Sequence, residues 1–317
     1  MKNLETIQKL FWVSRPISWP NTSYPFLVGF LLASSWPLSP LSIVTLAVGT
    51  LYFIGPFNLL MYGVNDVFDY ESDMRNPRKG GVEGALTPKP LLARHAIIST
   101  LLLAPFLIFV AATYPPLTLL SLLVLLVLSA GYNAPPTRLK GRPVLDSLTN
   151  VLYAIPLQVG LHAAGSTNLV DAPVLVFAAW GIGAHALTTI TDRDEDAAAG
   201  VRTIAVLLGR RNTALFAAAW FALVGFGVAT ITGTPAAALL ALPYLALCFI
   251  GRDARGEAGR RLYRLFLIAN VALGASITMM VLLSVSVDAA IPAGLLAMAG
   301  TAIALGVSVG RAVLQRR

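Results

Sequence analysis

Long uninterrupted stretches of apolar residues constrain this chain more than any other feature of its sequence. They run over Leu41–Met61, Ile97–Ala112, Leu117–Ala130, Thr213–Ile231 and Leu265–Val287. Each approaches or reaches the ~20 residues that an α-helix needs to cross a bilayer. Only 12% of the residues are charged, about half the ~25% of an ordinary soluble domain. The sequence therefore predicts an all-α, polytopic membrane protein rather than a water-soluble globule.

The apolar runs predict about nine or ten transmembrane helices in a single membrane-embedded domain that covers residues 1–317. In this scheme Leu41–Val64 and Leu145–Ala164 are each one continuous span, and residues 290–314 form an accessory tenth span. Ten spans of about 20 residues use roughly 200 positions. The loops between them are then short, and no separate soluble domain is expected.

All 23 lysine and arginine residues fall on one side of the ten-span scheme. They lie before the first span, after the last, and in the loops that follow the even-numbered spans. Basic loops stay in the cytoplasm when membrane proteins insert. We therefore expect a multi-pass protein of the cell membrane whose termini and active-site loops are cytoplasmic. The net charge of +8 then marks a face beside anionic headgroups, and it does not indicate binding of nucleic acid.

Acidic residues gather in two clusters at the cytoplasmic ends of expected spans. Asp66, Asp69 and Asp73 follow at steps of three and four residues, and Asp192 and Asp196 are four apart, so a helix places each set on one face. Like charges stacked at a membrane surface are costly unless a cation lies between them. Carboxylate and amide oxygens are the hard ligands that suit Mg²⁺. The predicted metal ligands are Asn65, Asp66, Asp69, Asp73, Asp192 and Asp196.

Basic residues lie beside both clusters. Arg78 and Lys79 follow the first cluster, Arg202 follows the second, and Lys140 lies in the loop between them. Carboxylates, Mg²⁺ and cations that converge on one place are typical of a diphosphate site. We therefore expect the four basic residues to bind substrate phosphates. The predicted catalytic residues, which act by holding the metal at the diphosphate, are Asp66, Asp69, Asp192 and Asp196.

At these residues the sequence resembles the UbiA superfamily of intramembrane prenyltransferases. Residues 65–73 match the NDxxDxxxD motif of that family in full, and residues 192–196 with the following Gly200 and Thr203 match its second motif. The resemblance covers about residues 12–285. It implies a bundle of about nine helices around a central cavity, with the aspartate motifs capping the cavity on the cytoplasmic side.

The same resemblance implies a prenyl diphosphate as substrate, Mg²⁺ as cofactor and a lipophilic acceptor. It includes further positions before the first span and after the fourth, and these are implied to bind substrate. They are Arg15, Asn21, Tyr132 and Lys140.

More narrowly, residues 14–22, residues 63–73 with 76–81, and His185 look like the lycopene elongase branch. That branch is similar to enzymes that add dimethylallyl units to the ends of lycopene on the way to C50 carotenoids. The resemblance implies dimethylallyl diphosphate as donor, lycopene or a related carotenoid as acceptor, and a membrane-lipid environment. His185 then belongs to the substrate-binding residues. Residues 188–191 depart from the small-residue and proline stretch that the branch usually has.

Two other functions remain open at this point. An aromatic prenyltransferase of quinone, haem or chlorophyll pathways would use the same donor chemistry with a phenolic acceptor. A secondary transporter would also have about ten spans, but its coupling residues should lie near the bilayer midplane in interrupted helices. Here the acidic residues gather at helix ends on one side, which favours a prenyltransferase.

Overall fold

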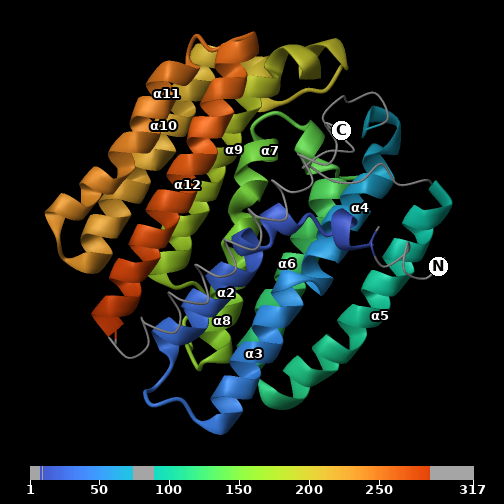
Figure 1. Cartoon of the computed structure of the whole chain (residues 1–317), viewed down its shortest axis with the longest axis vertical. Coiled ribbons are helices and arrows are strands. Elements are labelled where there is room, and N and C mark those ends of the chain that lie inside the picture. Colours follow the sequence, from blue (N-terminus) through green and yellow to red (C-terminus); the bar gives the residue numbers. More distant parts are fainter. Residues whose placement is uncertain (1–7, 9, 74–88, 286–317) are drawn as a thin grey trace. The chain divides into compact units, whose positions relative to one another are not determined.

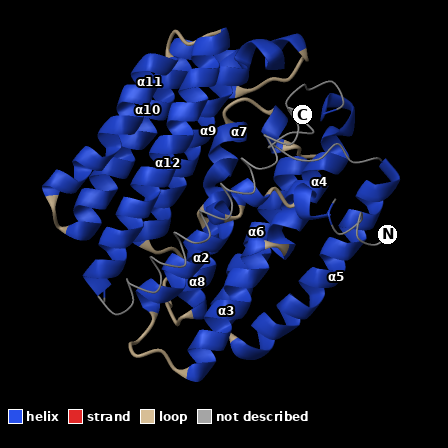
Figure 2. Ribbon diagram, in the orientation of Figure 1, coloured by secondary structure: helices blue, strands red, loops and turns tan. Residues whose placement is uncertain are grey.

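The computed structural model describes residue 8, residues 10–73 and residues 89–285 of the chain. Within these residues the regular elements are all helical (Figures 1 and 2), as the apolar runs predict. The expected tenth span at residues 290–314 lies outside the described part. By its internal contacts the chain divides into two compact units. Unit 1 comprises residues 1–134, 156–167 and 285–317, and unit 2 comprises residues 135–155 and 168–284.

In its described residues, unit 1 contains five long α-helices and one shorter α-helix. Proline residues begin α2, α3, α4 and α6, where the missing N–H is one of those that a helix start leaves unpaired in any case. Several large aromatic side chains of α2–α5 are buried together, and the rings of Tyr52 and Phe106 stack with centroids 3.6 Å apart. The elements of the unit are η1 (Pro16–Ser18), α2 (Pro20–Ala33), α3 (Pro40–Ile54), α4 (Pro56–Asp73), α5 (Lys89–Thr113), α6 (Pro116–Asn133) and α8 (Ile155–Ala163).

Unit 2 is built around α9 and α10, which pack along each other and against shorter helices. Leu187, Ile190, Ile204, Phe221 and Leu262 are fully buried in its core. Gly233 ends α10 in the left-handed conformation, as glycine commonly does after a helix. The elements of the unit are η2 (Leu139–Gly141), α7 (Leu145–Leu148), η3 (Thr149–Tyr153), α9 (Ala172–Ala198), α10 (Ile204–Thr232), η4 (Pro235–Ala241), α11 (Leu242–Gly251) and α12 (Gly256–Val285).

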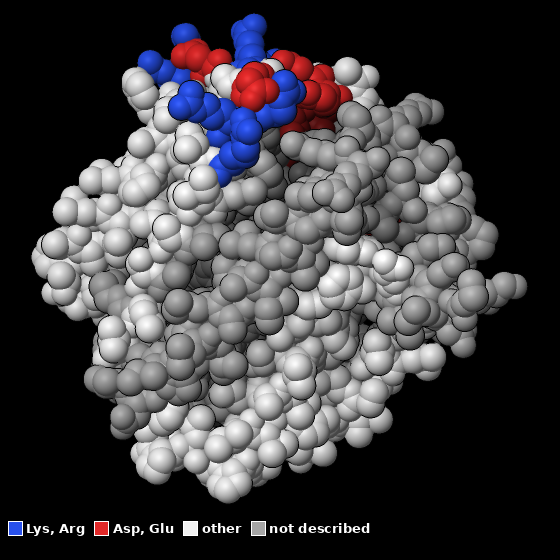
Figure 3. Space-filling model, in the orientation of Figure 1, with Lys and Arg blue, Asp and Glu red and all other residues white. Residues whose placement is uncertain are grey.

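Four of the described helical segments are long and apolar enough to cross a membrane. They are Pro40–Tyr70, Pro116–Asn133, Ala172–Ala198 and Ile204–Thr232. Large apolar side chains on these and neighbouring helices point outwards; that of Phe226 is 71% exposed. In Figure 3 the charged side chains lie over the end of unit 2 where α10 begins and α11 ends, and the other described residues in view are uncharged. The chain is therefore a membrane protein.

One expected span is continuous in the structure and another is interrupted. Leu41–Val64 lies within the single candidate span Pro40–Tyr70, in which Gly55 separates α3 from α4. Leu145–Ala164 is replaced by α7, η3 and α8. The interruption lies at Ala154, and Pro156 is the second residue of the helix that follows, where its missing N–H is one of those that a helix start leaves unpaired. Helix α8 therefore starts at Ile155 as a new helix.

The backbones of α2 and α8 meet within unit 1 at two glycines. A Cβ atom placed on Gly29 would lie 2.1 Å from the carbonyl oxygen of Leu157, and one placed on Gly160 would lie 2.1 Å from the carbonyl oxygen of Phe26. No real Cβ atom tolerates such contacts. Small residues at helix crossings are typical of membrane bundles, where they allow close van der Waals packing.

Replacement of Gly160 by valine is expected to lower the stability of the folded protein by about 3 kcal/mol, because α2 and α8 must separate. Thermal unfolding of the purified protein in detergent measures this effect as a lower midpoint. Gly274→Val is the matched control, since a Cβ on Gly274 has no heavy atom within 4 Å. Equal midpoints for the two variants would contradict the close crossing.

Candidate active site

The first acidic motif lies on the last turns of α4 in unit 1. Asp66 is buried, with a relative exposure of 4%, whereas Asp69 is half-buried. The amide of Asn65 donates to Oδ1 of Asp66 over 3.5 Å. The helix therefore continues through the motif, as its three- and four-residue spacing predicts. The side chain of Asp73 lies outside the described part of the chain.

Arg15 is a cationic partner of the first motif. One of its terminal nitrogens lies 2.9 Å from Oδ1 of Asp66, and its guanidinium lies over the ring of Tyr62 at 4.4 Å from the ring centroid. Arg15 has φ 50°, so the turn before η1 aims its side chain from the N-terminal segment towards α4. The resemblance implied Arg15 as a substrate-binding residue, and the structure places it directly against a predicted metal ligand.

The second acidic motif lies at the end of α9 in unit 2. Asp192 and Asp196 are both half-buried. The hydroxyl of Thr191 donates to Oδ1 of Asp192 over 3.1 Å, and the hydroxyl of Thr203 donates to Oδ2 of Asp196 over 3.3 Å. The loop between α9 and α10 is thus tied back to the motif that precedes it.

Asp146 holds the start of α10, a role that the sequence motifs did not predict. It is fully buried, its Oδ2 accepts the backbone N–H of Ile204 over 2.8 Å, and its Oδ1 accepts the backbone N–H of Ser147 over 2.8 Å. The carboxylate therefore satisfies the first unpaired N–H of α10. Thr203, the residue at the N-cap position, makes no side-chain cap bond and bonds Asp196 instead. An isolated acid in an apolar stretch was the signal that could have indicated this role.

His185 lies within α9, seven residues before Asp192. Its Nδ1 is 3.1 Å from the hydroxyl of Ser147 in α7. In unit 2 the structure thus joins His185 to α7 and Asp146 to α10. Binding of substrate by His185 remains a prediction.

The other predicted substrate-binding residues are spread over the chain. Asn21 is exposed at the start of α2, Tyr132 lies near the end of α6, Lys140 lies in η2, and Arg202 is exposed in the loop before α10. Residues 78 and 79, both predicted to bind diphosphate, fall outside the described residues. The first motif belongs to unit 1 and the second to unit 2. That both motifs bind the same diphosphate therefore remains a prediction.

Exposed ion pairs cover the ends of α9, α10 and α12. Asp194 pairs with Arg193 at 3.1 Å and with Arg210 at 2.5 Å. The pKa of Glu257 lies below its usual range because Arg260 donates a hydrogen bond to it, with Arg264 adding to the effect. Exposed pairs of this kind contribute little to stability. Asp194, in contrast to its motif neighbours, is therefore a surface residue that pairs with arginines.

The donor set of each motif fits Mg²⁺. Within the described residues no three His, Cys, Asp or Glu side chains are grouped closely enough to hold a metal by themselves. Mg²⁺ does not need such a cage, because it usually binds one or two carboxylates together with substrate phosphates and water. Asp66 and Asp69 on α4, and Asp192 and Asp196 on α9, supply two carboxylates per motif. The pairing of Asp66 with Arg15 shows that this buried carboxylate already stabilises a cation.

Comparison with known proteins places the chain among membrane prenyltransferases. A model described as the UbiA prenyltransferase family matches residues 22–273. The C(50) beta-cyclic carotenoids biosynthesis protein LbtBC of Dietzia sp. is 37% identical over 291 residues, which span 88% of this chain and 65% of that protein. A lycopene elongase/hydratase of Corynebacterium glutamicum is 35% identical over 292 residues, which span 88% of this chain and 98% of that protein.

The fold is also found in solved structures. A UbiA homolog from Archaeoglobus fulgidus, bound to DMAPP and Mg²⁺, superposes with a TM-score of 0.62. The match covers 84% of this chain and 98% of that chain at 19% sequence identity. At this identity the likeness concerns the fold. It agrees with the helical bundle that the sequence predicts.

Proposed function

The chain belongs to the UbiA prenyltransferase family and is a prenyltransferase, and from that membership we propose that it transfers dimethylallyl groups from dimethylallyl diphosphate to the ends of lycopene. The reaction depends on Mg²⁺ and leads towards C50 carotenoids. The observation that carries this proposal is the 35% identity across 98% of a protein named lycopene elongase/hydratase. The alternative that the chain acts on an aromatic acceptor lacks such support.

The two acidic motifs and the nearby cations bind the donor. Asn65, Asp66, Asp69, Asp73, Asp192 and Asp196 would hold Mg²⁺, which would neutralise the diphosphate charge that grows as the C–O bond breaks. Arg15 lies at Asp66, so its guanidinium can turn to a phosphate oxygen once the carboxylate is engaged. Charge-assisted bonds of this kind are short and strong. Residues 78 and 79, together with Lys140 and Arg202, complete the proposed diphosphate-binding set.

The coupling step follows from the ionisation of the donor. The C–O bond breaks, diphosphate leaves with the electron pair, and the resulting allylic cation is attacked by a terminal alkene of the acceptor. The new tertiary cation then loses a proton, or it captures water and releases a proton to give an alcohol. The name of the Corynebacterium glutamicum relative includes hydratase, so we propose water capture for this chain. An apolar surrounding protects the first cation from premature hydrolysis.

The proposal is tested with membranes that contain the chain, lycopene, dimethylallyl diphosphate and Mg²⁺. We expect C45 and C50 carotenoids to form, their formation to stop when the metal is chelated with EDTA, and activity to return when Mg²⁺ is added in excess. A phenolic acceptor supplied in place of lycopene serves as the second arm. Prenylation of the phenol without any elongation of lycopene would overturn the carotenoid assignment in favour of an aromatic prenyltransferase.

A further inference from the structure

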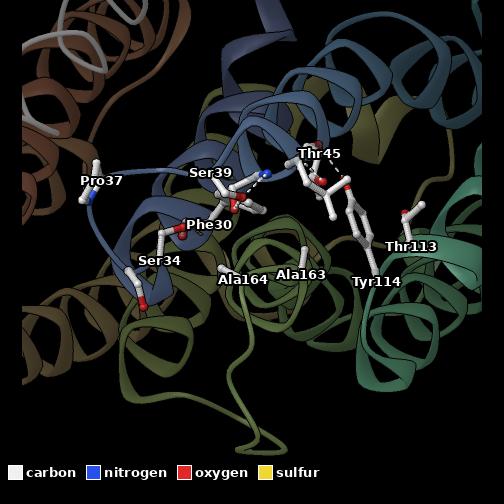
Figure 4. Close-up of a pocket in the computed structure, with 12 residues that line it drawn as sticks. Phe30, Ser34, Pro37, Ser39, Thr45, Thr113, Tyr114, Ala163 and Ala164 are labelled. Atoms are coloured by element: carbon white, nitrogen blue, oxygen red, sulfur yellow. Dashed lines mark hydrogen bonds between the residues drawn. The ribbon is translucent and has the colours of Figure 1, made fainter.

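Unit 1 has a cavity at the end of its helices opposite the first acidic motif. The cavity has a volume of about 360 Å³ and is formed by the end of α2, the start of α3, the end of α5 and the end of α8 (Figure 4). Its lining includes Phe30 and the hydroxyl groups of Ser34, Ser39, Thr45, Thr113 and Tyr114. The proposed diphosphate site does not use any of these residues.

Four of the hydroxyl groups around this cavity, those of Ser34, Thr45, Thr113 and Tyr114, already donate to backbone carbonyls and therefore offer acceptors. Ser34 donates its proton to the carbonyl of Phe30 over 2.7 Å, and Thr45 donates to the carbonyl of Leu41 over 2.6 Å. Tyr114 likewise donates to the carbonyl of Thr45 over 2.5 Å. A hydroxyl has one proton and two lone pairs. Once its proton is engaged, its oxygen can still accept a hydrogen bond from a ligand.

The side chains that line the cavity determine which kind of ligand it can bind. The side chains that line the cavity carry no formal charge, so a phosphate or carboxylate would lose its hydration without a cation to pair with. An alcohol suits the site, because its O–H donates to the free lone pairs and its carbon skeleton contacts Phe30 and the alanines of α8. The geometry therefore favours a neutral, hydroxyl-bearing end of an apolar molecule.

The distance of the cavity from the first acidic motif matches a long acceptor. Thr45 in the cavity wall and Asp66 in the motif are separated by α3 and α4, which form one candidate span of 31 residues. At 1.5 Å per residue the 21 steps between them correspond to about 30 Å, which is close to the thickness of a bilayer core. An extended carotenoid that spans the membrane therefore has one end near each site.

We propose that this cavity binds the hydroxylated end of a carotenoid whose other end is being prenylated. The inference rests on the proposed function and extends it. After one addition with water capture, the acceptor has one alcohol end and one unmodified end. For the second addition the molecule must enter with its unmodified end at the diphosphate site. The alcohol end then reaches the cavity, where the hydroxyl oxygens of Ser34 and Thr45 accept a hydrogen bond from its O–H.

The test compares two C45 acceptors that differ only in this end. One carries the alcohol, and the other carries an alkene formed by proton loss. For the wild-type protein we expect the KM of the alcohol to be roughly tenfold below that of the alkene, as one or two hydrogen bonds would give. In the double variant S34A/T45V we expect the two KM values to become equal, with kcat and the KM of lycopene unchanged.

Thr230→Val is the matched control for the double variant. Thr230 is exposed on α10, and its hydroxyl donates to the carbonyl of Phe226 four residues earlier, as that of Thr45 does with Leu41. This control should keep the wild-type KM ratio, and thermal midpoints verify that S34A/T45V is folded. If S34A is folded but the double variant is not, the single variant replaces it in the assay.

The outcomes separate this proposal from the proposed function. Equal KM values for the two C45 acceptors in the wild type, or a wild-type ratio retained in the variant, would overturn the alcohol site while lycopene elongation stands. Elongation of lycopene without any transfer to the C45 alcohol would overturn it as well. Failure of the wild-type protein to elongate lycopene would instead contradict the proposed function, and this inference with it.

Discussion

Replacement of Asp66 by alanine is expected to lower prenyl transfer by at least about 100-fold. The change removes a predicted metal ligand from a site that stabilises a leaving diphosphate. It also leaves the guanidinium of Arg15 without its carboxylate partner at 2.9 Å. Asp192→Ala should have an effect of similar size, because the second motif supplies the other half of the proposed ligand set. Initial rates of diphosphate release in membranes measure both losses.

Asp253→Ala is the control for these two variants. Asp253 lies in the exposed loop between α11 and α12, where it pairs with Arg211 at 3.1 Å and with Arg252 at 3.2 Å. Its removal also deletes an acid at a charged end of the bundle, yet activity should stay near the wild-type level. Undiminished turnover in D66A with a normal thermal midpoint would refute the metal role of the first motif.

Replacement of Asp146 by asparagine is expected to destabilise unit 2 by about 3 kcal/mol. The side chain keeps its size, but one carboxylate oxygen becomes an NH₂ group that faces a backbone N–H of Ile204 or Ser147. Two buried bonds to a charged acceptor thereby become one neutral bond and one donor facing a donor. Because Ile204 follows directly on Thr203, which bonds Asp196, the loop between α9 and α10 should loosen.

Trypsin reports this loosening at Arg202, which is exposed in that loop. We expect cleavage after Arg202 to become at least about fivefold faster in D146N, since a local opening that costs 1 kcal/mol less is populated about fivefold more. Asp253→Asn serves as the isosteric control at an exposed acid. Cleavage at the wild-type rate, together with an unchanged thermal midpoint, would show that Asp146 does not anchor α10.

Local sequence patterns were sufficient to predict the helical membrane bundle and the two motifs. Apolar runs predict helices because only a helix satisfies its own backbone in lipid. The spacing of Asp66 and Asp69 predicts one helical face, and α4 indeed continues through both residues. These predictions succeed because they depend on contacts within a few residues of each other.

The interactions that the sequence alone did not predict join distant residues. Arg15 and Asp66 are 51 positions apart, and Asp146 and Ile204 are 58 apart. Hydropathy likewise predicts an unbroken span from Leu145 to Ala164, because it averages over Pro156 and over the buried carboxylate of Asp146. Such pairings depend on how the helices pack, and no local spacing encodes them.

Gly209 gives α10 two mechanically separate parts. Its φ of 74° and ψ of 164° interrupt the helical backbone, and this φ is strained for any residue with a side chain. The first five residues of α10, which Asp146 anchors, are therefore set off from the long apolar segment that follows. The hydroxyl of Thr213 on that segment donates back to the carbonyl of Gly209, so the direction in which the loop behind the second motif meets the segment depends on a backbone conformation that only glycine adopts without strain.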